Sequence, residues 1–386
     1  MAGIDISIVA LYFVLILGVG IWTGRKEENT RDFFVGNRQI PWIAVLCSIV
    51  ATEISAATFL GVPEASYNGN MNYLQFGIGS LLARFFIAFL FISAFYKFDC
   101  LTVYEYLSKR FGGTTRYTAT IFFFLGRVLG SGVRLLMAAI GLSVVMGINI
   151  NYAIMLFALI AIIYTAFGGI KAIVWTDVIQ VFIFIGGGIA VLVYIVQQFR
   201  STGQLDNAIK ILKDQNKFEV FRMASTKQWF ADANIYWLAM INGLVTTFAA
   251  LGTDQDMTQR MLTCKDTKSS QKSLILSGFV GIPVMTLFLF IGLGVYAYYQ
   301  INPIFPVSYI PLVAGCKYTP EAKEMFPYFI TNLPVGLKGL LLIGIFSAAM
   351  SSLDSALGAL SSSSVIDIYK PLINKNASEN HYLKVS

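Results

Sequence analysis

The sequence predicts an all-α integral membrane protein, and three observations support this fold class. Of the 386 residues, 56% are hydrophobic and 13% are charged, with a mean hydropathy of +0.68, whereas soluble domains carry roughly a quarter charged residues. Apolar windows long enough to cross a bilayer recur along the whole chain. The short connections between these windows alternate between basic and uncharged. A soluble enzyme and long disordered regions are therefore excluded.

A hydrocarbon core about 30 Å thick requires about 20 mostly apolar residues in a helix. Such windows predict nine spans, at residues 4–22, 42–60, 73–96, 118–146, 152–167, 172–197, 235–251, 273–299 and 337–368. No basic residue precedes the first window and no small-residue cleavage pattern follows it, so it is a span and not a signal peptide. We expect one membrane domain over residues 1–370, with a tail at 371–386.

Basic residues set the expected orientation. They gather in the connections after the first, third and seventh spans and in the tail: Arg25, Lys26, Arg31, Arg38, Lys97, Lys109, Arg110, Arg116, Arg260, Lys265, Lys268, Lys272, Lys370 and Lys375. The connections 61–72 and 147–151 contain no Lys or Arg. The long loop 200–232 also carries lysines, but long loops report orientation poorly. We therefore expect a multi-pass protein of the plasma or inner membrane, with its N-terminus outside and its C-terminus in the cytoplasm.

The net charge of +7 then serves as an anchor to acidic lipid headgroups, and no nucleic-acid partner is expected. The four cysteines show no CxxC spacing and His381 is the single histidine, which excludes a Cys/His metal site. Cys316 alone would face the oxidising side, so no intramolecular disulfide is expected. No nucleophile lies beside a base within the spans, so the chain is not expected to be an enzyme.

Two spans are interrupted by small, hydroxyl and acidic residues. Residues 48–61 place Glu53 among serines, threonines and alanines, a composition typical of a helix that unwinds near the midplane and offers carbonyls to a cation. A tight helix–helix interface built on small residues is the alternative. Residues 242–256 repeat the pattern five spans later, and this spacing indicates an inverted repeat.

The last span gathers hydroxyls and an acid. Ser351, Ser352 and Ser355 lie with Asp354 within little more than one helical turn. Hard cations such as sodium prefer oxygen ligands of this kind. The alternative is that each serine hydroxyl donates to the carbonyl four residues before it.

The fourth span carries Arg127 and Arg134, seven residues apart and so on nearly one face. An arginine in the membrane keeps its charge and requires an anion. Arg127 is expected to pair with Glu53 or with a substrate carboxylate, and Arg134 to snorkel or to bond a backbone carbonyl. Asp177 in the sixth span has Lys171 as its simplest partner.

Several short stretches together resemble the sodium/solute symporter family, whose members include bacterial sugar, proline and sialic acid transporters. The resemblance runs from about residue 5 to 370 and rests on RDFFVGNR at 31–38, YEYL at 104–107, GG at 168–169 with WTDVIQ at 175–180, QR at 259–260, and AAMSS at 348–352 with DIY at 367–369. It implies a five-plus-five inverted repeat preceded by one extra helix. The first repeat would occupy about 42–199 and the second about 234–370, apparently truncated after the eighth core helix.

The resemblance also implies ion sites. The main sodium ion would be bound by the carbonyls of Ala51, Ile54 and Ala348 and by the hydroxyls of Ser351 and Ser352. A second sodium site, used by some members, would match Asp177, Asp354 and Ser355. Asp354 stands where those members have serine, so a second ion stays open. Sodium acts here as the coupling ion, and no cofactor is expected.

For the solute, the resemblance implies contacts from the broken helix, the next helices and the repeat partner: Glu53, Ser55, Thr58, Gln75, Arg127 and Thr247. Arg127 matches the arginine that binds the carboxylate in the sialic acid branch, whereas Glu53 replaces an Asn or Thr. The expected function is sodium-coupled import of a small polar organic solute, such as a carboxylate or a sugar acid like sialic acid, by alternating access. A solute-sensing membrane receptor or an inactive transporter fragment is the alternative.

Overall fold

The computed structural model describes residues 3–24, 29–165, 169–223, 235–302 and 325–386. Within these ranges the protein is built from helices, and the one β-bridge joins Ile40 to Cys264. The predictions made for Arg25, Lys26 and Cys316 lie outside the described residues.

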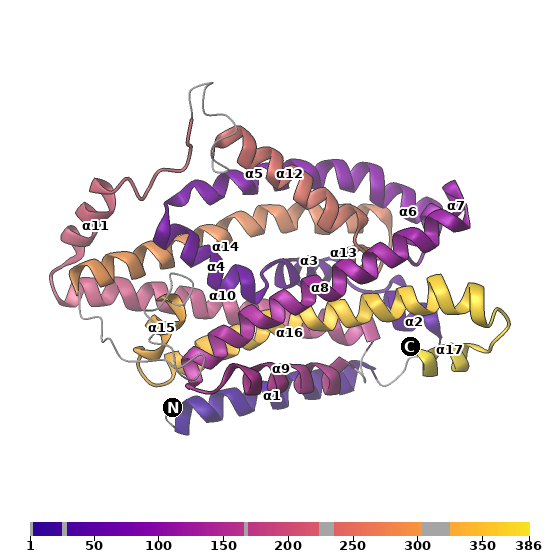
Figure 1. Ribbon diagram of the computed structural model, residues 1–386, viewed down its shortest axis with the longest axis horizontal. Helices are drawn as coiled ribbons and strands as arrows, with labels where there is room; N and C mark the ends of the chain where they lie inside the picture. Colours follow the sequence, from indigo (N-terminus) through magenta and orange to yellow (C-terminus); the bar gives the residue numbers. More distant parts are fainter. Residues whose placement is uncertain (1–2, 25–28, 166–168, 224–234, 303–324) are drawn as a thin grey trace.

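Seven helical segments of the described chain are long and apolar enough to cross a membrane (Figure 1). They are α1 (Gly3–Gly24), η2–α5–η3–α6 (Met71–Lys97), α8 (Gly113–Met146), α10 (Gly169–Ser201), α12–η5 (Tyr236–Thr253), α14 (Thr267–Ile301) and α16–η7 (Leu337–Ile373). A bent pair, α3 (Trp42–Glu53) and α4 (Ala56–Asn68), and the shorter apolar helix α9 (Ile150–Thr165) occupy the two other windows that the sequence singled out.

Shorter helices connect these segments. They are α2 (Thr30–Val35), η1 (Gly36–Arg38), α7 (Val103–Phe111), α11 (Leu205–Asp214), α13 (Gln255–Met261), α15 (Met325–Thr331) and α17 (Glu379–Val385). In Figure 1, α2, α7 and α17 gather at one end of the molecule, and α11 and α15 lie at the other.

The predicted interruption of the second span is confirmed. The backbone leaves the helix at Ile54 (φ −86°, ψ 71°) and Ser55 (φ −70°, ψ 170°), and the axis bends by 56°. The amide of Thr58 donates to the carbonyl of Ser55 (2.9 Å). The carbonyl of Ile54 is thereby left without its usual donor four residues later.

The interruption predicted for residues 242–256 falls at Asp254, which is extended (φ −85°, ψ 128°) and caps α13 by accepting from the amide of Asp256 (2.9 Å). Helix α13 follows immediately and is wholly buried. Its side chains Gln255, Asp256 and Arg260 therefore point into protein and not into solvent.

Helix α16 forms the centre of the bundle. The most apolar window of its span is 83% buried, compared with 22% for α1, which places α1 at the periphery. Helix α16 packs against α10, α8, α1 and α3. The polar residues of its sequence therefore face other helices and not lipid.

Helices α5 and α12 touch backbone to backbone. A Cβ atom on Gly79 would lie 1.9 Å from the carbonyl oxygen of Met240, and one on Gly243 would lie 2.1 Å from that of Phe76. Only glycine permits this approach, which is a common way for membrane helices to pack.

The basic connections lie at the end that holds α2 and α7 (Figure 1). Arg31 and Arg38 both pair with Asp99, at 3.0 and 2.8 Å. The ammonium of Lys272 lies 3.9 Å from the centre of the Trp42 ring. The connections that the sequence identified as basic therefore lie at one end of the molecule, which we call the basic end, whereas the lysines of α11 lie at the other end.

Candidate functional site

The first part of the site lies where the end of α3 crosses α16. The hydroxyls of Thr52 and Ser351 are 3.2 Å apart, and Ser351 donates to Oδ1 of Asp177 on α10 (2.6 Å). The crossing brings together two chain segments that are about 300 residues apart in sequence.

The five residues expected to hold the main sodium ion lie on this pair of elements and are buried: Ala51, Ile54, Ala348, Ser351 and Ser352. The back-bonding alternative holds for two of the three serines. The hydroxyl of Ser352 donates to the carbonyl of Ala348 at a long 3.3 Å, and that of Ser355 donates to the carbonyl of Ser351. The donor atoms are all uncharged oxygens, which suits a monovalent hard cation.

Beside this crossing, Arg260 connects α13 to α10, α3 and α16. Its Nη2 atom donates to Asp177 Oδ2 (3.1 Å) and to the hydroxyl of Ser355, and its Nε atom donates to Ser48 (2.8 Å). Its Nη1 atom donates to the carbonyl and the carboxylate of Asp256. All five guanidinium N–H groups are therefore used.

The prediction that Lys171 pairs with Asp177 is wrong, because Lys171 pairs with Asp32 on α2 and Arg260 pairs with Asp177. The physical reason is helical periodicity. Six positions apart, residues 171 and 177 point to different sides of α10.

Asp354 stands apart from these pairs. Its side chain is fully buried, and neither carboxylate oxygen has a partner among the described residues. It lies three positions after Ser351 on α16, on the face that meets Asp177. A buried carboxylate without a partner is costly, so this position requires a counter-charge or a proton.

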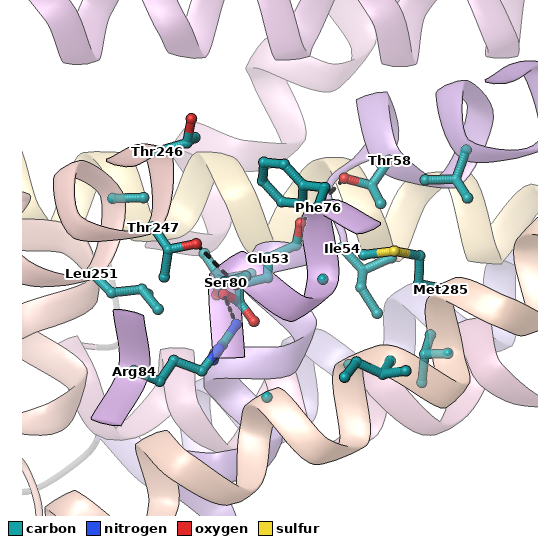
Figure 2. A pocket seen from close by; sticks show the side chains of 18 of the residues that line it. Glu53, Ile54, Thr58, Phe76, Ser80, Arg84, Thr246, Thr247, Leu251 and Met285 are labelled. Carbon is teal, nitrogen blue, oxygen red and sulfur yellow. Dashed lines mark hydrogen bonds and ion pairs between the residues drawn. The ribbon is translucent and has the colours of Figure 1, made fainter. Parts of the chain in front are cut away.

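The second part of the site is a cavity of about 250 Å³ between the α3–α4 break and helices α5, α12 and α14. Its polar lining residues are Thr52, Glu53, Thr58, Tyr73, Ser80, Arg84, Arg134, Thr246 and Thr247. Figure 2 shows Glu53, Ser80, Arg84 and Thr247 pointing toward one another. Thr247 donates to Ser80 (2.8 Å), which ties α12 to α5.

Of the residues expected to contact the solute, Glu53, Thr58 and Thr247 line this cavity, whereas Ser55, Gln75 and Arg127 do not. Gln75 is buried, donates to the carbonyl of Asn72 (3.1 Å) and accepts from the amide of Arg222 (3.2 Å). Its amide joins the start of α5 to η2 and to the backbone at Arg222.

The prediction that Arg127 pairs with Glu53 is wrong. Arg127 pairs with Asp256 and, at 3.5 Å, with Asp254, while Glu53 pairs with Arg84 on α5. Sequence reasoning did not single out Arg84. The signal was an isolated arginine in the middle of an apolar span, which marks an interior partner.

The expectation that Arg134 bonds a backbone carbonyl is also wrong, whereas its snorkelling stays a prediction. Arg134 is half-buried and lines the cavity, and the hydrogen bonds and ion pairs of the described residues do not include it. The two arginines of α8 therefore have different surroundings. Arg127 is held by acids of the α12–α13 junction, whereas the Arg134 guanidinium has no hydrogen bond or ion pair within the described part of the chain.

Among the described residues, no group of three His, Cys, Asp or Glu side chains is placed to bind a metal ion. The oxygen-rich crossing and the cavity are adjacent, because Thr52, Glu53 and Ile54 line the cavity at the helix break. An ion at the crossing and a solute in the cavity would therefore contact the same break.

Comparison with known proteins gives consistent results. A model of the Sodium:solute symporter family matches residues 33–386. The chain is 31% identical to the sodium/sialic acid symporter SiaT of Proteus mirabilis (strain HI4320), over 99% of this chain and 74% of that protein. It is 28% identical to the sodium/glucose cotransporter of Vibrio parahaemolyticus, over 99% and 72%. It is 27% identical to the sodium-coupled monocarboxylate transporter 2 of Mus musculus, over 95% and 58%.

A solved structure, described as the substrate-bound outward-open state of a Na⁺-coupled sialic acid symporter, superposes with a TM-score of 0.88 at 28% identity. The match covers 100% of this chain and 77% of that one. The expected symporter fold is therefore confirmed. The chain belongs to the sodium:solute symporter family and is a multi-pass, Na⁺-coupled membrane transporter.

Proposed function

We propose that this protein uses the sodium gradient to import a small polar organic solute that carries a carboxylate. The observation that carries the proposal is Arg134, a guanidinium in the cavity beside the helix break that has no hydrogen bond or ion pair among the described residues. A carboxylate of the solute would form the bidentate hydrogen-bonded ion pair that arginine favours. Thr58 and Thr247 supply hydrogen-bonding groups to the rest of the molecule.

Sodium would bind first, at the crossing of α3 and α16. The carbonyls of Ala51, Ile54 and Ala348 and the hydroxyls of Ser351 and Ser352 would hold it. The bound ion would order the break at Ile54, which is also a wall of the cavity. Because one element contacts both ligands, each ligand would favour the binding of the other.

A second cation is supported mainly by Asp354. Arg260 already occupies Asp177 and Ser355, so these two residues have little left to offer an ion. Both oxygens of Asp354, in the same buried region, have no partner in the described part of the chain. A second cation would bind against the carboxylate of Asp354.

Import follows from the orientation that the basic end suggests, with the N-terminus outside and the basic end in the cytoplasm of a plasma or inner membrane. Rocking of one group of helices against the other would then expose the site to each side in turn. A membrane potential of 100 mV contributes about 2.3 kcal/mol per sodium ion.

The test is uptake by proteoliposomes that contain the full chain. Radiolabelled N-acetylneuraminate and L-lactate would be offered with and without an inward sodium gradient. We expect uptake of at least one of them to depend on the gradient and to be lost in Arg134→Gln but not in Arg200→Gln, at an exposed helix end. Equal rates with and without the gradient would refute coupling, and binding without uptake would favour the sensor alternative.

A further inference from the structure

The cavity is lined by one carboxylate and two guanidinium groups. Of its lining residues only Glu53, Arg84 and Arg134 are ionisable at neutral pH. Glu53 forms an ion pair with Arg84, whereas Arg134 has no such partner among the described residues. The cavity therefore carries a net charge of +1, located at Arg134.

The Glu53–Arg84 pair is firmly positioned. The side chain of Arg84 is 5% exposed, and its Nη1 atom donates to the hydroxyl of Ser277 on α14 (2.5 Å). A Cβ atom on Gly278 would lie 2.6 Å from Cδ of Arg84. The arginine stem thus lies in a groove that only glycine leaves open, with its head held between Ser277 and Glu53.

One carboxylate oxygen of Glu53 remains available as a hydrogen-bond acceptor. Only its Oε1 atom takes part in the pair with Arg84, and its side chain is 25% exposed, toward the cavity (Figure 2). Its other oxygen can accept a hydrogen bond from a hydroxyl or amide N–H of the solute. The same carboxylate repels any further negative charge placed beside it.

We infer that Glu53 sets the charge selectivity of this cavity and restricts the solute to a monoanion. The inference rests on the proposed function. One carboxylate on Arg134 neutralises the cavity, whereas a second one would face Glu53, since Arg84 is already paired. An unpaired charge in a partly desolvated cavity is strongly unfavourable. A second carboxylate or a phosphate on the solute is therefore rejected.

The test compares solutes that share a skeleton but differ in charge. Binding to the full chain in detergent with sodium chloride, near neutral pH, would be measured by titration calorimetry with two pairs of probes: N-acetylneuraminate with its 9-phosphate, and L-lactate with L-malate. We expect at least one monoanion to bind about tenfold or more tightly than its more highly charged partner.

Glu53→Gln keeps the shape of the side chain and frees the charge of Arg84. It should raise the affinity for the multiply charged probe by about tenfold and reduce or reverse the preference. Glu53→Asp keeps the charge and should keep the preference. A merely structural role for Glu53 would weaken all probes alike in Glu53→Gln.

Three results would overturn the inference: equal affinity of the wild type for both members of each pair, no binding of either monoanion, or no gain for the multiply charged probes in Glu53→Gln. Transport is judged separately. If the charge preference is present but no sodium-driven uptake occurs, only the proposed function fails. If sodium drives uptake of N-acetylneuraminate or L-lactate but both members of each pair bind equally well, only this inference fails.

Discussion

At the scale of single residues, two buried arginines have different roles because their neighbours differ. Arg260 uses every N–H group to join Asp177, Asp256, Ser48 and Ser355. Arg84 retains an unpartnered Nε atom beside its pair with Glu53. The first is a structural centre, and the second belongs to a wall that a solute can touch.

Removal of the Ser352 hydroxyl should weaken sodium binding more than solute binding. In Ser352→Ala we expect the sodium concentration at half-maximal uptake to rise about tenfold, because one ligand is lost, while solute affinity at saturating sodium changes little. Uptake at varied sodium concentrations measures this. Ser347→Ala, one turn earlier with its hydroxyl bonded to Tyr12 (3.1 Å), is the matched control. A selective loss of solute affinity in Ser352→Ala would contradict the sodium assignment.

Substitution of the two arginines of α8 should have different effects: one variant should lose stability and the other should lose solute binding. Arg127→Gln leaves Asp254 and part of Asp256 without a counter-charge, and we expect it to cost about 3 kcal/mol of stability. Arg134→Gln breaks no ion pair among the described residues, so its Tm should stay near that of the wild type while solute binding is lost. Thermal unfolding and calorimetry on both variants check this. If instead Arg127→Gln lost solute binding and Arg134→Gln lost stability, Arg127 would be the arginine that binds the solute.

The sequence was sufficient to find the serines of α16 and the acid at the helix break, because such residues are rare inside apolar spans. It was not sufficient to find their partners. Periodicity tells which face of a helix a side chain occupies, but not which other helix crosses that face. Glu53 therefore received Arg127 as a predicted partner, and the unremarked Arg84 is its partner in the structure.

At the scale of elements, the spans were largely predictable because about 20 apolar residues are a strong signal. The break at Ile54 was predictable for the opposite reason, since polar and small residues interrupt that signal. The placement of α13 was not. Residues 255–261 are polar and look like a loop, but their partners on α10 and α16 bury them.

The crossing of α5 and α12 should tolerate no added methyl group. Gly79→Ala would place Cβ 1.9 Å from the Met240 carbonyl oxygen, and such overpacking costs about 1–3 kcal/mol or more. We expect a lower Tm and a lower yield of folded protein. Gly130→Ala on α8, where nothing lies within 4 Å of the new Cβ, should behave like the wild type or better. Equal stability of the two variants would mean that the crossing is looser than described.

At the scale of the whole molecule, the tail returns to the beginning of the chain. Glu379 at the start of α17 accepts from the amide (3.0 Å) and the hydroxyl (2.7 Å) of Thr30, at the start of α2. These hydrogen bonds, first from the backbone and then from the side chain, hold the pKa of Glu379 below its ordinary value of 4.5. The ionised carboxylate therefore favours the docked tail.

Docking of the tail should consequently depend on pH. Because the pKa is lowered in the docked state, the stabilisation is present above about pH 4.5 and is lost as the pH falls through the lowered value. A nitroxide attached at position 384 should be immobile at neutral pH and mobile in acid by EPR. In Glu379→Gln the mobility should no longer depend on pH. Acid release that persists in this variant would assign the transition to another group.

The backbone contact between α5 and α12 also limits how the transporter can cycle. Helices in such contact cannot slide or rotate past each other without collision of main-chain atoms. We therefore expect α5 and α12 to move as one rigid body. Arg84 on α5 and Thr247 on α12 would then move together. This side of the cavity should therefore keep its shape during transport, and we expect opening to occur along its boundary with α3, α4, α8 and α14, which line the rest of the cavity.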